Sequence, residues 1–343
     1  MVVVRPAALE DLEQIACLAG LADFGLTTLP PDREILRRRL LQARHSFASI
    51  AERPGGETYF FVLEDLDAGR IVGTSGIVSK VGGFEPFYMY QLKAMVRESP
   101  ALGVRRELQV LHLIAEHDGP CEIGTLFLAP EHRGTGHGRL LSRSRFLFMA
   151  EYRQAFAPSV IAEMRGVIDA QGHSPFWEAV GRHFFGMDFP RADRLSVQDK
   201  KFIAELLPAY PVYVPLLPAQ AQAAIGQVHE RTRPALKILR EEGFQFSGMV
   251  DIFDAGPIVT CPVDQVRTVK ESARALVEEL CIPRGPECII ANTPDCPQDF
   301  RACSGAIERR EGRGVCIAPG TAAVLGVKAG DRVRFAPLRP GSG

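Results

Sequence analysis

The chain has 343 residues, of which 46% are hydrophobic and 24% are charged, and its 40 basic and 41 acidic side chains leave a formal net charge of −1. At roughly 150 residues per domain, this length predicts about two domains, and the apolar content excludes a disordered chain. The balanced charge lacks the basic field of a general nucleic-acid binder, so we expect no nucleic-acid partner. A local site for a small anion is still compatible with this charge.

No segment indicates secretion or a membrane span. Residues 1–6 contain neither a basic segment nor an apolar run of signal-peptide length. The longest uncharged run, residues 206–228, contains four prolines, which excludes a membrane helix. The eight cysteines form no Cys-x-x-Cys pair, so we expect neither a metal site nor a disulfide framework. The sequence predicts a cytoplasmic protein with reduced thiols.

The first part of the chain combines short strands with amphipathic helices. Asp32 precedes the second helix and has the side chain of an N-cap residue. The turn at residues 67–69 predicts a hairpin between the strands on either side of it. The expected elements are a strand at 2–4, helices at 8–20 and 32–47, and strands at 59–63 and 71–78.

Residues 82–118 lack a clear periodicity, and we expect an irregular insertion there with one helix near residues 105–115. Regular patterns resume after it. They predict a strand at 123–128, a helix at 139–152, a strand at 160–168, helices at 175–185 and 234–242, and a strand at 244–253. This order of elements around a buried strand indicates an α/β (α+β) fold.

The character of the sequence changes near residue 256, where prolines, glycines, cysteines and short Val/Ile runs replace the amphipathic helices. Residues 324–333 have the turn-and-strand pattern of small β-barrels. We therefore predict an α/β domain over residues 1–256 and a small, mainly β C-terminal domain over residues 257–343.

A glycine-rich turn joins the strand at 123–128 to the helix that follows. The turn reads Arg133-Gly134-Thr135-Gly136-His137-Gly138. Its three glycines permit a backbone in which successive N–H groups point to one side, and the helix N-terminus adds a partial positive charge. Arg139 and Arg143 lie one helical turn apart and are expected to meet further phosphate oxygens. The turn is a candidate anion site, and the alternative is a tight turn without a ligand.

Competing glycine motifs do not fit this turn. A P-loop requires a lysine, and the dinucleotide fingerprint requires a glycine where Arg139 stands. The remaining Arg-x-x-Gly-x-Gly pattern resembles the pyrophosphate loop of the GCN5-related N-acyltransferases. The resemblance implies that fold, with insertions, and an acyl-coenzyme A bound by residues 133–139. It also implies a preceding strand, residues 124–128, that offers backbone groups to the pantetheine arm, although a plain core strand fits as well.

Several segments together are similar to the arginine N-succinyltransferase family over about residues 2–260. They are Gly25-Leu26-Thr27-Thr28-Leu29-Pro30, Phe61-Val62-Leu63-Glu64-Asp65, Ala162-Glu163-Met164-Arg165-Gly166, Ser174-Pro175-Phe176-Trp177, Phe202-Ile203-Ala204-Glu205-Leu206, Ile225-Gly226-Gln227-Val228-His229 and Asp251-Ile252-Phe253-Asp254. This resemblance implies transfer of a succinyl group from succinyl-CoA, a co-substrate and not a permanent cofactor, to the α-amino group of L-arginine, the first step of arginine catabolism by succinylation. Some members also take ornithine and work as two related subunits, so a homo- or hetero-oligomer is expected.

The family's functional residues match two positions. Leu126 falls at a succinyl-CoA contact, and Phe127 and Leu128 continue that strand. His229 falls at the family's proton donor, a role that suits a side chain of pKa near 6.5. Many acyltransferases of the wider superfamily place a tyrosine acid where this chain has Trp177, which has no acidic proton to deliver. Either Trp177 is core packing or the acid comes from elsewhere, in agreement with His229.

The remaining site candidates rest on chemistry alone. Glu122 and Glu163 are candidate bases for the amine, with strand-end ion pairs as the alternative. Arg165 is a candidate for binding a substrate carboxylate, and a structural ion pair explains it equally well. His112 and His117 stay without a predicted role. The alternatives for the whole chain are an acyltransferase for ornithine or another acyl-CoA, and a non-catalytic coenzyme-binding subunit of a hetero-oligomer.

Overall fold

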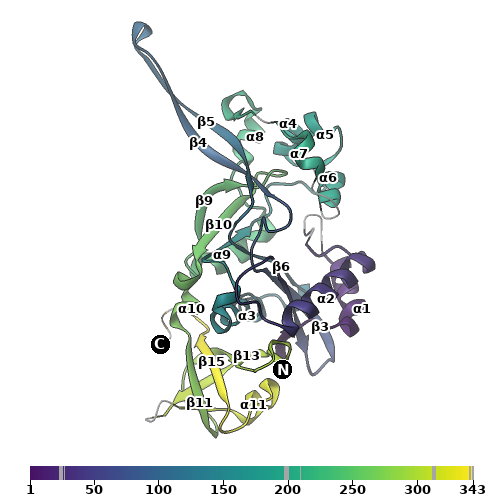
Figure 1. Cartoon of the computed structure of the whole chain (residues 1–343), viewed down its shortest axis with the longest axis vertical. Coiled ribbons are helices and arrows are strands. Elements are labelled where there is room, and N and C mark those ends of the chain that lie inside the picture. The colour runs from purple at the N-terminus through teal and green to yellow at the C-terminus, as the bar shows by residue number, and fades with distance from the viewer. Residues whose placement is uncertain are drawn as a thin grey trace.

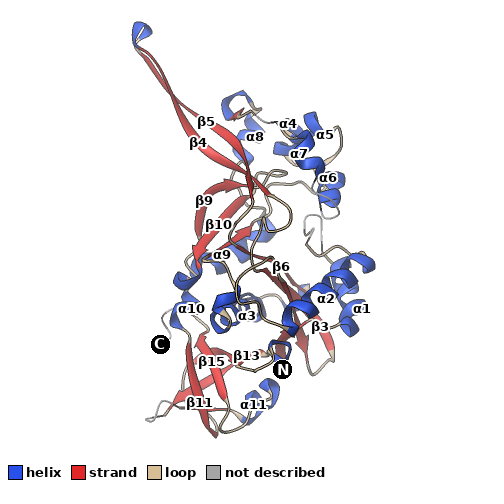
Figure 2. Ribbon diagram, viewed as in Figure 1, coloured by secondary structure: helices blue, strands red, loops and turns tan. Residues whose placement is uncertain are grey.

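The computed structural model describes residues 1–22, 26, 28–196, 201–208, 210–310, 314–339 and 341. Gly25 and Thr27 of the segment that resembles the succinyltransferase family lie outside the described residues. Within the described part of the chain, fifteen strands form one continuous sheet in the order β12-β15-β11-β14-β13-β1-β2-β3-β6-β7-β10-β9-β4-β5-β8. Figure 2 shows helices α1, α2 and α3 beside the central strands of this sheet.

The strands of the N-terminal part are β1 (Val2–Pro6), β2 (Thr58–Asp65), β3 (Arg70–Val78), β4 (Phe87–Ser99), β5 (Val104–Glu116), β6 (Cys121–Leu128), β7 (Ser159–Glu163), β8 (Val212–Tyr213), β9 (Gln245–Val250) and β10 (Pro257–Pro262). The α-helices are α1 (Leu12–Gly20), α2 (Arg33–Ala48), α3 (His137–Glu151), α4 (Pro175–Ala179), α5 (Gly181–Phe185), α6 (Phe189–Ser196), α7 (Lys201–Leu206), α8 (Ala219–Ala224), α9 (Arg233–Glu241), α10 (Arg267–Glu271) and α11 (Pro319–Leu325).

The predicted elements of the first 80 residues are confirmed. The Asp32 carboxylate accepts hydrogen bonds from the backbone N–H groups of Glu34 and Ile35, so it caps α2 as its residue type predicts. Strands β2 and β3 form the predicted hairpin, with pairs from Asp65–Arg70 to Thr58–Val78. The mixed α/β fold class is also confirmed.

The prediction for residues 82–118 is wrong. In place of an irregular stretch with a helix at 105–115, β4 and β5 form a long antiparallel hairpin, paired from Phe87–Glu116 to Ser99–Val104. Figure 1 shows this arm extending away from the body of the molecule. Residues 105–115 contain good helix formers, but pairing along the full length of β4 overrides this local preference.

Two further elements are shorter than predicted. The strand expected at 160–168 is β7, which ends at Glu163. The helix expected at 175–185 is divided into α4 and α5 at Val180, whose backbone is not helical. The predicted helix before Gly243 and the strand after it are present as α9 and β9.

The C-terminal strands close into a small barrel. They are β11 (Ala273–Leu280), β12 (Glu287–Asn292), β13 (Ala302–Arg309), β14 (Val315–Ile317) and β15 (Arg332–Pro337). Strand β12 pairs with both β13 and β15, and β14 pairs with β13 and β11, so the ring β12-β15-β11-β14-β13 has no free edge. Val277, Ile290 and Phe335 are buried in its interior. The prediction of a small, mainly β C-terminal region is thus met.

The expectation that all thiols are reduced is wrong in the structure. Cys281 and Cys316 form a disulfide with their Cα atoms 6.0 Å apart, while six other cysteines are free. The parallel pairing of β11 with β14, which places Leu280 opposite Ile317, brings the two cysteines together. Because 35 positions separate them, their spacing carries no signal in the sequence. No helix in the described part of the chain is long and apolar enough to span a membrane.

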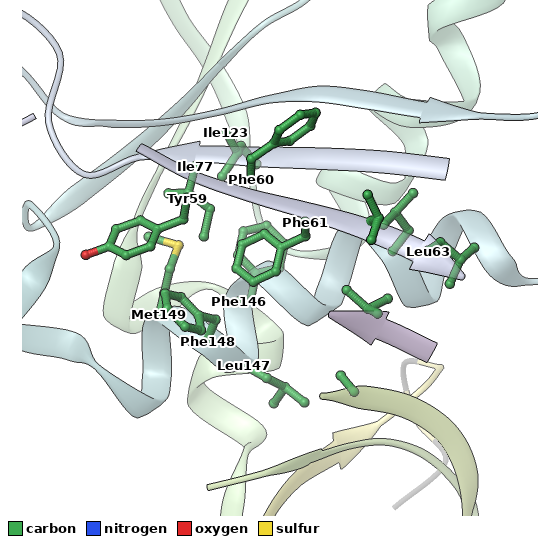
Figure 3. Packing of buried hydrophobic residues seen from close by; sticks show 14 of the residues in the cluster. Tyr59, Phe60, Phe61, Leu63, Ile77, Ile123, Phe146, Leu147, Phe148 and Met149 are labelled. Atoms are coloured by element: carbon green, nitrogen blue, oxygen red, sulfur yellow. The ribbon is translucent and has the colours of Figure 1, made fainter. Parts of the chain in front are cut away.

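The main core lies between the central strands and the helices. Tyr59 and Phe61 of β2 point toward Phe148 of α3, as Figure 3 shows, and their rings lie 5.1 and 5.2 Å from the Phe148 ring. Phe47 of α2 packs edge-on against the same ring. This aromatic layer holds α3 against the sheet and thereby fixes the glycine-rich turn at the start of the helix.

Candidate functional site

Strands β6 and β7 separate soon after they begin. They pair in parallel only at Cys121–Val160 and Glu122–Ile161. The rest of β6 pairs with β3 on its other side, where the register shifts and Thr125 has a φ of 55°. From Ile123 onward, one edge of β6 therefore has no strand partner among the described residues. Such an edge can accept an extended ligand through backbone hydrogen bonds.

The glycine-rich turn follows this edge directly. Gly134 and Gly136 have φ values of 81° and 94°, a conformation that glycine adopts without strain. Among the described residues, the N–H groups of Gly134, Thr135 and Gly136 have no hydrogen-bond acceptor, and α3 begins at His137. A Cβ atom added at either glycine would meet nothing within 4 Å. The turn thus offers open N–H donors at a helix N-terminus, which suits a phosphate group.

Side chains of the turn rest against the strand. The Arg133 Nε donates to the Leu128 carbonyl at 3.1 Å, and its guanidinium lies 5.7 Å from the Phe127 ring centre. The Thr135 hydroxyl donates to the His132 carbonyl at 2.7 Å and closes the turn. Burial and the neighbouring His132 lower the pKa of His137. His137 is therefore held neutral at neutral pH, and the turn's positive character comes from its backbone and its arginines.

The two arginines predicted to meet phosphate oxygens behave differently. Arg139 is partly exposed, with its Nη2 atom 3.6 Å from a Glu241 oxygen. The prediction for Arg143 is wrong, because its side chain is fully buried and pairs with Glu241 at 2.8 Å and Glu242 at 2.7 Å. The i+4 spacing places both arginines on one helix face, but that face meets the end of α9 at Arg143.

His229 lies in the loop between α8 and α9, next to the end of β7. Its backbone N–H donates to the Arg165 carbonyl at 2.8 Å. Its ring Nδ1 accepts a hydrogen bond from the Arg231 N–H at 3.3 Å. In the neutral imidazole this acceptor role leaves the proton on Nε2, so the ring has a proton to donate.

Arg165 has carboxylate partners on two sides. It contacts Asp254 at 3.0 Å and Asp193 at 3.1 Å, and the Asp254 carboxylate also accepts from the Gly166 N–H. Burial acts to lower the pKa of Arg165, but the charges of the two aspartates outweigh it and raise the pKa. Burial and the nearby Asp254 raise the pKa of Asp251. The structural ion pair that was the alternative for Arg165 is present, and a substrate-binding role stays a prediction.

The other candidates occupy different environments. Glu122 lies half-buried on β6 and lines a 320 Å³ pocket with Lys80 and Phe87. Glu163 is exposed at the end of β7. Trp177 is fully buried, its Nε1 donates to the Met187 carbonyl at 3.0 Å, and it stacks on two phenylalanine rings. Trp177 is therefore core packing.

The sequence did not reveal two features near this region. The first is a 610 Å³ pocket between α4 and α8, lined by Val167, Ile168, Asp169, His173, Pro175, Glu178, Ala179, His183, Leu216, Leu217, Pro218, Gln220 and Ala221. The second is Arg145 of α3, a fully buried arginine beneath β6. Neither has a local sequence signal, because each depends on how distant segments pack.

Comparison with known proteins identifies the family. The family model described as "Arginine N-succinyltransferase beta subunit" matches residues 2–268, and the model of its C-terminal domain matches residues 272–337. The chain is 42% identical to the arginine N-succinyltransferase of Yersinia pestis (strain Pestoides F) and to the arginine N-succinyltransferase subunit beta of Pseudomonas aeruginosa, covering 98% of each chain.

A solved structure agrees over the same length. The arginine/ornithine succinyltransferase subunit AI from Pseudomonas aeruginosa superposes with a TM-score of 0.90 at 37% identity, covering 98% of this chain and 99% of that one. The match extends through the barrel as well as the α/β part. The chain belongs to the arginine N-succinyltransferase beta subunit family.

Proposed function

We propose that this protein is an acyl-CoA-dependent N-acyltransferase that moves the succinyl group of succinyl-CoA to the α-amino group of L-arginine, the first step of arginine catabolism by succinylation. The observation that carries the proposal is the unpaired edge of β6 leading into the open N–H groups of the glycine-rich turn. Membership of the succinyltransferase family supports the choice of donor and acceptor.

In this proposal the coenzyme lies along β6 and ends at α3. The diphosphate accepts hydrogen bonds from the N–H groups of residues 134–138, with Arg133 and Arg139 beside it. The pantetheine arm extends along Leu126, Phe127 and Leu128 in place of a strand partner. This arrangement positions the thioester where β6 and β7 separate.

The chemistry is a direct transfer. The neutral α-amine attacks the thioester carbonyl, a C–N bond forms, and the C–S bond breaks. Backbone N–H groups of β6 stabilise the oxyanion. His229 donates its Nε2 proton to the departing thiolate, and the amine loses a proton to a base, for which Glu163 and Glu122 are the candidates. Arg165 stays the candidate for a substrate carboxylate.

A thiol-release assay tests this function. The purified chain is incubated with succinyl-CoA and a panel of amino acids, and free thiol is measured. We expect release with L-arginine and less with ornithine. Release only with ornithine or another acyl-CoA would favour the alternative acyltransferase. Coenzyme binding without release for any amine would favour a non-catalytic subunit.

We also propose a domain division, a cellular location and an oligomeric state for this protein. The first is that residues 1–256 form the acyltransferase domain and residues 257–343 form the C-terminal domain, although β10, just after that boundary, pairs with β7. The second is a cytoplasmic location. The third is a homo- or hetero-oligomer with a related subunit, which the "subunit" names of relatives support.

The β4–β5 arm is our candidate for the oligomer contact. Its outer half exposes Val96, Leu102 and Val104, at 46%, 77% and 38% of their surface. Replacing residues 95–107 with a short turn should lower the number of subunits in the assembly, measured by analytical ultracentrifugation. An unchanged number of subunits would remove the arm from the contact.

A further inference from the structure

Arg145 of α3 is a buried cation that has no counter-ion in the described part of the chain. Its side chain is 2% exposed. It donates to the Ser142 carbonyl at 3.0 Å, to the Ser142 hydroxyl at 2.8 Å and, weakly, to the Gly124 carbonyl at 3.4 Å. No carboxylate among the described residues pairs with it. Burial lowers the pKa of Arg145 to about 9. An ion buried without an opposite charge destabilises a fold, so its presence calls for a partner.

The guanidinium lies beside the point where the two strands separate. Gly124 comes two residues after Glu122, which makes the last β6–β7 pair. The bond from Arg145 Nη1 to the Gly124 carbonyl therefore reaches the stretch of β6 that has no neighbour on its β7 side. This is the stretch along which the proposed function places the acyl end of the donor.

A buried serine hydroxyl lies in the same layer as Arg145, between α3 and the sheet. Ser75 of β3 is fully buried, and its Oγ atom has no hydrogen-bond partner among the residues that the structure describes. Ser75 is opposite Phe61 in the β2–β3 register, so both side chains point to one face of the sheet. Phe61 packs on Phe148, which lies one turn after Arg145 on α3. Ser75 and Arg145 thus both lie between α3 and the sheet.

The β3–β6 pairing brings Ser75 to β6 at the same level. The register shifts between Thr74 and Gly76, so Ser75 stands opposite the bulge at Thr125. The Ser75 hydroxyl and the Arg145 guanidinium therefore both lie on the α3 side of the sheet, at the level of residues 124–126. Both are buried hydrogen-bond donors, and neither has an anionic partner in the described chain.

We propose that Arg145 and Ser75 bind the terminal carboxylate of the acyl donor and so select a dicarboxylic acyl group over a neutral one. The inference rests on the proposed function for the position of the thioester. Two methylene groups separate that carboxylate from the thioester carbonyl in a succinyl group. A planar guanidinium suits a carboxylate, because it donates two parallel hydrogen bonds.

The test compares two acyl-CoA donors that differ only in the terminal group of the acyl chain. Succinyl-CoA and butyryl-CoA have acyl chains of equal length, with a carboxylate in one and a methyl group in the other. For Arg145→Met we expect kcat/KM with succinyl-CoA to fall about 100-fold, while kcat/KM with butyryl-CoA stays within about threefold of wild type. For Ser75→Ala we expect a loss of about fivefold with succinyl-CoA alone.

Matched variants separate this effect from damage to the fold. Ser144→Ala removes a buried hydroxyl of α3 that donates to the Leu141 carbonyl, and it should leave the ratio of kcat/KM for the two donors unchanged. Arg145→Lys keeps the charge and should restore part of the preference for succinyl-CoA. An equal loss with both donors in Arg145→Met and Ser75→Ala would overturn the inference, because a merely structural role lowers both.

A binding measurement keeps the inference separate from the proposed activity. Succinyl-CoA should raise the melting temperature of the wild-type protein more than butyryl-CoA does, and Arg145→Lys should reduce that difference. If the wild-type chain releases no thiol but still shows this difference, the proposed function fails and the carboxylate site stands. If the two donors raise the melting temperature equally in the wild type, the carboxylate site fails.

Discussion

Helix α3 carries two buried arginines, one on each side, and their surroundings differ in charge. Toward α9, Arg143 meets Glu241 and Glu242, and Glu242 is itself fully buried. Toward the sheet, the acceptors that the described residues offer to Arg145 are neutral groups of Ser142 and Gly124. The charge of Arg143 is balanced by carboxylates of the chain, while the charge of Arg145 is balanced by no carboxylate in the described part of it. The difference separates a structural arginine from a ligand-binding one, although their residue type and burial are the same.

The largest effect is expected outside α3, at His229, the proposed proton donor. His229→Ala should lower kcat by about 10²–10⁴-fold, because the thiolate loses its proton donor. The coenzyme affinity and the melting temperature should stay near wild type, since the hydrogen bond that the described residues give the ring comes from the nearby Arg231 N–H. Steady-state kinetics and titration with coenzyme A check this. Unchanged turnover would remove His229 from the mechanism.

The structural side of α3 should respond through stability instead. Glu242 contacts Arg143 and Arg267 at 2.7 Å each and accepts from the Thr268 N–H. Removing its charge in Glu242→Gln leaves the buried Arg143 and the largely buried Arg267 short of a partner, with an expected loss of about 3–5 kcal/mol in the free energy of unfolding. Urea denaturation measures this loss.

Glu271→Gln is the matched control, because Glu271 pairs with Arg267 from the surface. We expect a loss of less than about 1 kcal/mol for this exposed partner. Equal losses from the two variants would contradict the idea that α3 has one charge-balanced side.

A smaller effect is expected at the turn before α3. Gly136→Ala places a Cβ where φ is 94°, at a cost of about 1–2 kcal/mol, without any clash within 4 Å. The strain should displace the N–H donors of the turn. A conformational cost of this size corresponds to a Kd for coenzyme A that is about tenfold higher. Calorimetric titration measures the Kd. Gly69→Ala, a left-handed glycine in the β2–β3 hairpin, should lower stability similarly without changing this Kd.

The smallest expected effect concerns pH. Burial, with Asp254 beside it, raises the pKa of Asp251 in the folded chain above that of the unfolded chain. The folded state therefore holds this proton more tightly, and the corresponding stability is fully present below about pH 4 and is lost as pH rises. Asp251→Asn should weaken this pH dependence. Near neutral pH, the free energy of unfolding of the variant should exceed that of the wild type by about 1 kcal/mol. Urea denaturation at several pH values measures it, and an unchanged slope would contradict the assigned direction.

Local rules predicted the features that depend on local chemistry. The cap at Asp32, the β2–β3 hairpin and the open turn of glycines at residues 134–136 follow from residue types that favour one backbone geometry. For the C-terminal region, the sequence predicted a small, mainly β structure but not the order of its strands. Their order, with β11 beside β14 and the disulfide that results, depends on contacts across the whole domain.

The wrong predictions have the same origin. Residues 105–115 favour a helix locally, and only pairing with β4 makes them a strand. Arg143 has the right spacing for a phosphate contact, but α9 brings two carboxylates to it from a hundred residues away. Arg145 and Ser75 give no sequence signal, because only the packed structure shows that Arg145 has no carboxylate partner, and the Ser75 hydroxyl no hydrogen-bond partner, among the described residues.

One measurement tests the proposed function most directly: the release of coenzyme A thiol from succinyl-CoA by the purified chain in the presence of L-arginine. We expect release that depends on both substrates and that falls by about 10²–10⁴-fold in His229→Ala. A chain that binds coenzyme A at the turn before α3 but releases no thiol with L-arginine would contradict the account.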